Sequence, residues 1–298
     1  MNTIVLVLFI FVFSSLLKAE EKKGFLSAED IALFHKQGYV IKRQCLSNLE
    51  MADLNKKIDA VISQSLSLIS RSKDLTFSDK DQMLYSNGSR IVCKNQPDQS
   101  VSIARINGCC GIEPELLSVV RSEKMVQTFF ELLGTTDLEH LISQIHPKLP
   151  GDGVAYPKHR DIQFRKSFDP NWQDALGNGS YAVCIIPIDS MTPENGGLWI
   201  DQNNYPNDEG SAENRLWIHA NPGDLLFMHP YLYHGSGPNT SSISRKTLLT
   251  GFCAFGANHK PYPGAHVNTR LKLNESGKIE ITNAPWSNEV MAGTGAGH

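Results

Sequence analysis

The feature that most constrains the fold is a change of periodicity near residue 138. From there to residue 255, short apolar runs alternate with turn signals rich in Gly, Pro, Asn and Asp. Short, evenly spaced strands with such turns are typical of an antiparallel sandwich or barrel. The candidate strands are Leu141–His146, Val154–Tyr156, His159–Phe164, Tyr181–Ile188, Leu198–Asp201, Leu216–His219, Leu225–Met228 and Thr247–Ala254. The sequence predicts a mainly β protein with flanking helices, a double-stranded β-helix of the jelly-roll, cupin-like type.

The N-terminal third has helical periodicity instead. Ser27 is a good N-cap for an amphipathic run that Gly38 closes, and a second cap at Ser47 or Asn48 opens a longer helix. A third helix is expected over residues 113–134. Residues 71–100 are polar and broken, which predicts an irregular segment that flanks or covers a site.

One domain is expected over residues 20–265, with a helical part at 25–135 and a jelly-roll core at 138–255. A tail with weak periodicity follows at 266–298.

Residues 1–19 resemble a secretory signal peptide or an N-terminal anchor. A wholly apolar run, Ile4–Phe13, stands before Ala19 and a charged segment, although no Lys or Arg precedes it. This predicts the secretory pathway, periplasm or extracellular space, and a cytoplasmic protein if the segment is not a functional signal. Membrane association is expected only if the segment is retained.

Composition excludes some functions. A formal net charge of -3 leaves no basic footprint, so nucleic acid is not an expected partner. The six cysteines form no CxxC pair, and Cys184 and Cys253 lie in apolar runs where buried free thiols are expected. A monomer or a weak oligomer is expected.

Three residues form a candidate metal centre. His159 and Asp161 are two apart in a predicted strand, so their side chains share a face. His234 ends an apolar run about seventy residues later. An HxD pair alone is weak evidence, because a surface His–Asp hydrogen bond gives the same pattern. Two imidazoles and one carboxylate are the facial triad of non-haem Fe(II) oxygenases, which leaves three coordination positions open.

Arg245 follows His234 by eleven residues, across a loop that predicts a hairpin with the two residues on facing strands. A 2-oxo acid and O2 would fill the three open positions, and the far carboxylate of 2-oxoglutarate needs a guanidinium. Arg245 is the candidate, with the hydroxyls of Ser236 and Thr247 nearby. Alone, Arg245 is more simply a solvent-exposed strand residue.

The chain resembles the phytanoyl-CoA dioxygenase (PhyH) family of Fe(II)/2-oxoglutarate oxygenases over most of residues 25–255. The similar segments are LSAEDIALFHKQGYVI at the start, QIHPKLPG at 144–151, PENGGLWI at 193–200, and PGDLLFMHPYLYHGSGPNTSSISRKTL from Pro222. The last is the most specific, with His-Gly-Ser-Gly-x-Asn and an arginine eleven residues after the histidine.

The resemblance implies His159, Asp161 and His234 as iron ligands. It also implies Arg245 and Ser236 as contacts of the distal carboxylate. Further co-substrate contacts are implied at Gln144 and, more loosely, at Arg105, with Lys148 an alternative cation that is otherwise structural or on the surface.

The sequence departs from the family at positions around the site. Lys158 stands before the first ligand where an aromatic residue is common, Arg160 replaces a common glutamine, and Ile185 or Cys184 replaces a tryptophan. None of these positions belongs to the ligand triad, so the differences bear on which substrate is bound rather than on the type of reaction. Asp161 argues against the related halogenases, which have Gly or Ala there. Arg160, Arg165 and Lys166 could bind an acidic group or form a solvated strand face.

The expected activity is hydroxylation of an unactivated C–H bond in a small organic substrate, with conversion of 2-oxoglutarate and O2 to succinate and CO2. Fe(II) is the expected metal, and ascorbate could stimulate turnover. One alternative is a non-catalytic, cupin-like binding module. Another is a zinc hydrolase, which needs an extra general base and has no use for Arg245. His146, His219 and His229 are further histidines that could be ligands.

Overall fold

A computed structural model describes residues 23–72, 81–96, 100–207 and 214–284. The predicted signal peptide, residues 1–19, lies outside this part of the chain. The helices are α1 (Ala28–Gln37), α2 (Asn48–Arg71), α3 (Leu117–Val120), α4 (Glu123–Leu133) and α5 (Asp161–Phe168). None of the helices that the structure describes combines the length and apolarity that a bilayer crossing requires.

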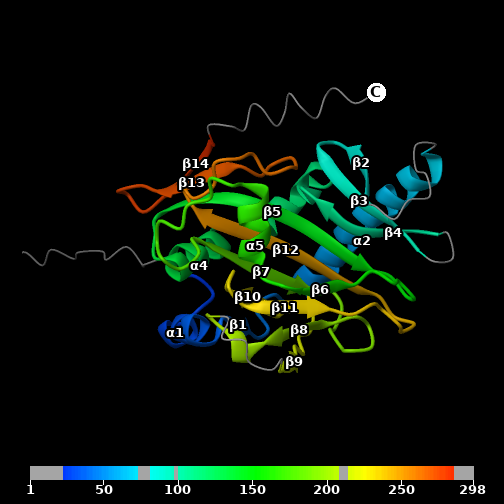
Figure 1. Cartoon of the computed structure of the whole chain (residues 1–298). Helices are drawn as coiled ribbons and strands as arrows, with labels where there is room; N and C mark the ends of the chain where they lie inside the picture. Colours follow the sequence, from blue (N-terminus) through cyan, green and yellow to red (C-terminus); the bar gives the residue numbers. More distant parts are fainter. Residues whose placement is uncertain (1–22, 73–80, 97–99, 208–213, 285–298) are drawn as a thin grey trace, which may run out of the picture.

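Two antiparallel sheets face each other, which confirms the predicted mainly β fold (Figure 1). The large sheet has the order β1-β10-β7-β12-β5-β4-β3-β2, and the small sheet has the order β6-β11-β8-β9. The first strands are β1 (Tyr39–Lys42), β2 (Gln82–Ser86), β3 (Ser89–Asn95), β4 (Val101–Asn107), β5 (Asp137–Lys148), β6 (Tyr156–His159) and β7 (Tyr181–Pro187). The remaining strands are β8 (Leu198–Asp201), β9 (Arg215–Trp217), β10 (Leu225–Met228), β11 (Tyr233–Ser236), β12 (Arg245–Ala254), β13 (Thr269–Leu273) and β14 (Ile279–Asn283).

Strand β7 shows why the central strands are apolar throughout. Its side chains alternate between two cores, as the two-residue period of a strand requires. Cys184 and Ile186 pack with the helices, whereas Val183 and Ile185 face the space between the sheets. Both faces are covered, so the usual alternation of apolar and polar residues is absent.

Helices α1 to α4 cover the outer face of the large sheet (Figure 1). Helix α1 begins with a reciprocal capping box at Ser27 and ends at Gly38 in the left-handed conformation, as predicted. Helix α2 is capped by Ser47 in the same way and buries one apolar stripe. The predicted helix over residues 113–134 is divided into the single-turn α3 and the eleven-residue α4, which has a new N-cap at Ser122.

Three segments differ from the sequence-based predictions. The region predicted as helical, 25–135, also contains β1 to β4, and the described part of the expected irregular segment 71–100 contains β2 and β3. The expected tail contains the hairpin β13–β14, whose first strand pairs with β5. These strands have partly exposed faces with polar residues, so their sequences lack the apolar runs of the central strands.

Candidate active site

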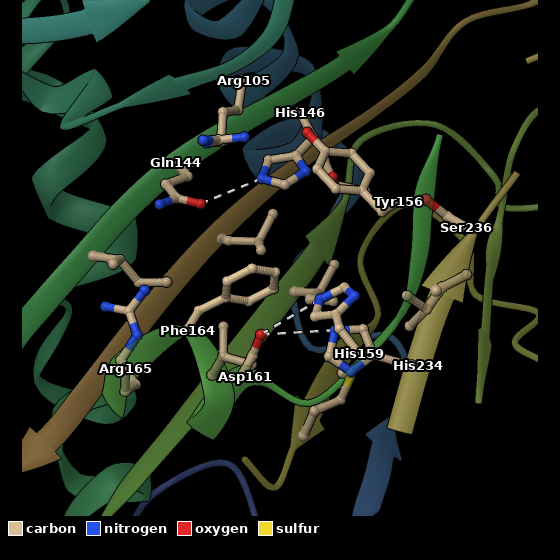
Figure 2. A pocket seen from close by; sticks show the side chains of 18 of the residues that line it. Arg105, Gln144, His146, Tyr156, His159, Asp161, Phe164, Arg165, His234 and Ser236 are labelled. Atoms are coloured by element: carbon tan, nitrogen blue, oxygen red, sulfur yellow. Dashed lines mark hydrogen bonds and ion pairs between the residues drawn. The ribbon is translucent and has the colours of Figure 1, made fainter. Parts of the chain in front are cut away.

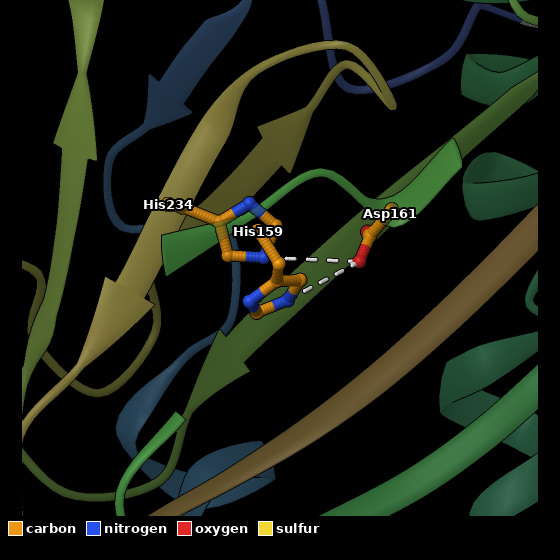
Figure 3. A group of neighbouring side chains, drawn as sticks. All are labelled: His159, Asp161 and His234. Atoms are coloured by element: carbon orange, nitrogen blue, oxygen red, sulfur yellow. Dashed lines mark ion pairs between the residues drawn. The ribbon is translucent and has the colours of Figure 1, made fainter. Parts of the chain in front are cut away.

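The side chains of His159, Asp161 and His234 meet between the sheets (Figure 3). His159 and His234 are directly opposite one another in the β6–β11 pairing. The Asp161 Oδ1 atom lies 3.9 Å from His159 Nε2 and 3.7 Å from His234 Nε2. One ligand atom from each residue lies within 4.8 Å of the others. This separation suits three groups around one ion.

Backbone carbonyls orient both imidazoles. His159 Nδ1 lies 2.7 Å from the Pro157 carbonyl oxygen, and His234 Nδ1 lies 3.0 Å from that of Leu232. A carbonyl only accepts, so each Nδ1 carries the hydrogen and each Nε2 keeps its lone pair. Burial lowers the pKa of His234 to about 4, which keeps this ligand neutral. The donor set fits a non-haem Fe(II) ion.

The prediction of a strand over His159–Phe164 is wrong, although its two polar residues do converge. The strand ends at His159, and α5 begins at Asp161. Arg160 occupies the N-cap, where its backbone N–H donates to Gln163 Oε1 at 3.0 Å. The buried Ile162 fixes this corner, since its N–H donates to the Pro230 carbonyl. A strand-to-helix corner therefore brings the two ligands together.

Arg245 is buried at the start of β12 and lines the same cavity as the three ligands. Its Nη2 donates to the Gly196 carbonyl at 2.8 Å, and its Nη1 donates to Thr247 Oγ1 at 3.2 Å. Its Nε, also buried, has no hydrogen-bond partner. Burial lowers the pKa of Arg245 to about 10, so the guanidinium remains charged at neutral pH.

The predicted hairpin between His234 and Arg245 does not form. Strand β11 pairs with β6 and β8, whereas β12 pairs with β5 and β7. The two residues therefore belong to different sheets and meet across the space between them. The Gly-rich loop that joins them crosses from one sheet to the other, which a turn signal alone does not distinguish from a hairpin.

The cavity has a volume of about 490 Å³, within the usual range for small-molecule sites. All the residues predicted to contact the co-substrate line it, namely Arg105, Gln144, Ser236, Arg245 and Thr247. Figure 2 shows Gln144 and Arg105 on the side of the cavity opposite His159 and His234. Gln144 lies between two cavity residues, because its Nε2 donates to the Tyr262 hydroxyl at 2.9 Å and its Oε1 is 3.3 Å from His146 Nε2.

Lys148, the alternative cation, is buried rather than on the surface. Its Nζ donates to Ser236 Oγ at 2.8 Å and to the carbonyls of Gly196 and Gly237. Burial, followed by the charge of Arg245, lowers the pKa of Lys148 to about 6. Since the Ser236 oxygen accepts from Lys148, its own hydrogen is left to donate to an anion beside Arg245.

The other histidines lie outside the ligand cluster. His146 lines the cavity and stacks on Tyr156, with ring centroids 5.2 Å apart. His219 is exposed, and His229 is buried against Phe34. Of the two residues that could replace the family's tryptophan, Ile185 lines the cavity and Cys184 faces the helices.

Sequence reasoning missed part of the cavity wall. Arg90 and Tyr262 line it without having been predicted. Arg165, expected either to bind an acidic group or to form a solvated strand face, is buried in the cavity wall. If this segment had been predicted as a helix, the four-residue spacing would have placed Arg165 one turn after Asp161, on the same side. No local signal marks Tyr262, which comes from the segment between β12 and β13. Arg160 and Lys158 contact Tyr233 outside the cavity, and Lys166 is exposed.

A model of the family "Phytanoyl-CoA dioxygenase (PhyH)" matches residues 34–247, which is more than half of the chain. The chain belongs to the phytanoyl-CoA dioxygenase family. The prediction of a 2-oxoglutarate-dependent non-haem iron oxygenase is thereby confirmed. The match includes all three candidate ligands and Arg245.

Individual relatives agree with this assignment. A probable phytanoyl-CoA dioxygenase from Caenorhabditis elegans is 21% identical over 254 residues, covering 75% of this chain and 74% of that protein. A methylphosphonate hydroxylase from Gimesia maris is 30% identical over 125 residues, covering 37% of this chain and 44% of the relative. The crystal structure of EctD from S. alaskensis superimposes with a TM-score of 0.61 at 18% identity, over 80% of this chain and 81% of EctD. At 18% identity, the similarity to EctD shows a common fold and nothing more.

Proposed function

We propose that this member of the phytanoyl-CoA dioxygenase family hydroxylates an unactivated C–H bond of a small organic substrate, converting 2-oxoglutarate and O2 to succinate and CO2. The observation that carries the proposal is the pairing of a two-histidine, one-carboxylate cluster with a buried arginine in one cavity. The name of one relative, methylphosphonate hydroxylase, states hydroxylation of a small molecule by that protein.

Each residue has a defined task in this proposal. His159, Asp161 and His234 hold iron(II), which when bound supplies the activation of O2 that couples decarboxylation of 2-oxoglutarate to removal of a hydrogen atom. Arg245 binds the distal carboxylate, and Ser236 donates its hydroxyl hydrogen to the same group. Apolar side chains, including Ile185 and Met228, line the cavity and exclude water from the reacting centre.

The cavity disfavours hydrolysis by a zinc ion. Among the described residues that line it, Asp161 is the sole carboxylate, so no additional Glu or Asp is placed as a general base. Arg245 would also have no role in that reaction.

The test is succinate formation by the purified protein with Fe(II), 2-oxoglutarate and ascorbate. We expect slow turnover without added substrate, loss of turnover in Asp161→Ala, and a raised KM for 2-oxoglutarate in Arg245→Ala. Equal binding of iron and 2-oxoglutarate by the wild type and Asp161→Ala would show the ligand assignment to be wrong. Binding of both without any turnover would instead favour the binding-module alternative.

A further inference from the structure

Arg165 is a buried cation whose hydrogen-bonding capacity is mostly unused. Its side chain is 9% exposed, and neither Nε nor Nη1 has a hydrogen-bond partner. Its Nη2 contacts the Tyr262 hydroxyl at 3.4 Å, and the guanidinium lies 4.5 Å from the centre of that ring. Within the described part of the chain Arg165 forms no ion pair. A buried charge without a partner is costly, so this arrangement points to an absent anion.

The surrounding wall carries further cationic side chains, and Figure 2 shows Arg105 in the same pocket as Arg165. Arg90 and Arg105 line the cavity with Arg165, and the Tyr262 hydroxyl accepts a hydrogen bond from Gln144. Burial would raise the pKa of Tyr262, but Arg165, Arg90 and Arg105 together lower it. The carboxylate nearest to Arg105 is that of Asp81, 3.9 Å away. In the described residues Arg90 has no ion pair either.

The established cofactors do not neutralise this wall. A divalent metal bound to Asp161 and a dicarboxylate held by Arg245 compensate one another's charge. Arg105 already has a counter-charge, because the Asp81 carboxylate lies 3.9 Å from it. Arg90 and Arg165 then remain without a counter-charge, so the third component of the reaction, the substrate, has to supply it.

We propose that the substrate is a small anion whose carboxylate or phosphonate group binds to Arg165, with Arg90 and Tyr262 beside it. This rests on the proposed function. Arg165 follows Asp161 by one turn of α5, and side chains at this spacing start about 5–6 Å apart. The acidic group therefore lies close to the metal, and the C–H bond that reacts is within a few bonds of it.

Apolar residues complete the substrate site. Ile142, Val183 and Leu249 also line the cavity and provide apolar surface for a short alkyl portion. A neutral molecule of the same shape would leave the buried guanidinium unpaired, so the site selects for the anion.

The experiment measures binding of three probes by calorimetry to protein saturated with 2-oxoglutarate and Mn(II) in place of iron. The probes are methylphosphonate, propionate and the uncharged propionamide. We expect at least one anion to bind and propionamide to bind at least about tenfold more weakly. Stronger binding of methylphosphonate identifies a phosphonate class, and stronger binding of propionate identifies a carboxylate class.

Variants assign the binding to Arg165. Arg165→Gln should weaken binding of the anion at least about tenfold, and Arg165→Lys should restore part of it. The matched control is Lys166→Gln, which makes the same charge change at an exposed position of the same helix and should bind like the wild type. If Arg165→Gln does not fold, Arg90→Gln tests the same wall and should also weaken binding.

Three results would overturn the proposal: failure of both anions to bind, equal binding of the anions and propionamide, or equal anion binding by all variants. A wrong proposed function would give a different result. The wild type would then not bind 2-oxoglutarate in a metal-dependent way, even before any probe is added. In Arg165→Gln that binding should be unchanged.

Discussion

Arg245 donates from Nη2 to the carbonyl oxygen of Gly196 at 2.8 Å, so a turn between β7 and β8 orients the arginine at the head of β12. The same carbonyl also accepts from Lys148 Nζ. Gly196 has a φ of 73°, and a Cβ there would lie 2.7 Å from the Gly237 carbonyl oxygen and 2.9 Å from that of Pro238. The Asn-Gly-Gly turn therefore holds the arginine that we propose as the co-substrate contact.

Gly196→Ala should weaken binding of 2-oxoglutarate while leaving metal binding unchanged. The added methyl group must push the loop away, which moves the carbonyl that holds Arg245. We also expect a loss of about 1–2 kcal/mol in unfolding free energy, measured with urea. Gly177→Ala is the control, since Gly177 has a φ of 70° and nothing within 4 Å of an added Cβ. Equal 2-oxoglutarate affinity in both variants would contradict this role for Gly196.

His159→Gln should lower affinity for Fe(II) or Mn(II) by about 100-fold or more. Loss of a residue that only hydrogen-bonds to a metal ligand typically lowers affinity about 10–100-fold, and loss of the ligand itself should cost at least as much. His146→Gln provides the comparison within the same cavity, because His146 lies outside the ligand cluster. It should retain metal affinity close to that of the wild type. Calorimetry or metal content after gel filtration measures the difference. Similar losses in both variants would argue for a different ligand set.

Lys148 makes folding stability depend on pH. Its pKa is lowered from 10.5 to about 6 in the folded state, so between these values the unfolded chain binds more protons. Stability of the metal-free protein should therefore rise between about pH 7 and 8.5, by at most about 1.4 kcal/mol per pH unit from this group. Lys148→Met should flatten that rise, whereas Lys56→Met, at an exposed helix position, should not. Urea unfolding at several pH values tests this, and an unchanged slope in Lys148→Met would refute it.

Neighbouring isoleucines on β7 should respond differently to truncation. Ile186 is fully buried against the helices, so Ile186→Ala leaves a closed cavity. This should lower the free energy of unfolding by about 2–5 kcal/mol. Ile185 already faces the cavity, so Ile185→Ala creates little new closed space and should cost about 2 kcal/mol, at the low end of that range. Equal losses of unfolding free energy would mean that the space beside Ile185 is filled in solution.

Local patterns predicted what depends on local interactions. The caps at Ser27 and Ser47, the strands β7, β8 and β10, and the family motifs around His159 and His234 all have short-range signals. The His–Asp pair was found even though its strand prediction was wrong, because a corner and a strand both allow residues two apart to converge.

Long-range contacts account for what was missed. The buried surroundings of Arg165 come from Tyr262, which is 97 residues away in the sequence. The separation of β11 and β12 into two sheets depends on which strands pair with them, and a loop sequence does not encode that choice. Strand β2 is partly exposed and belongs to the sheet through its pairing with β3, which in turn pairs with β4, so its place depends on partners that its own sequence does not reveal.

The division of the site between two sheets has a mechanical consequence. The proposed metal ligands lie on β6, β11 and the start of α5, whereas Arg245, Thr247 and Gln144 belong to the large sheet. A dicarboxylate that binds the metal at one end and Arg245 at the other would add a link between the two layers to the apolar core and the Lys148–Ser236 hydrogen bond that already join them. Its binding should therefore slow amide hydrogen exchange in the short strands β6 and β11 more than in the long, doubly covered β12. The bound co-substrate would then stabilise the packing of the two sheets as well as take part in the reaction.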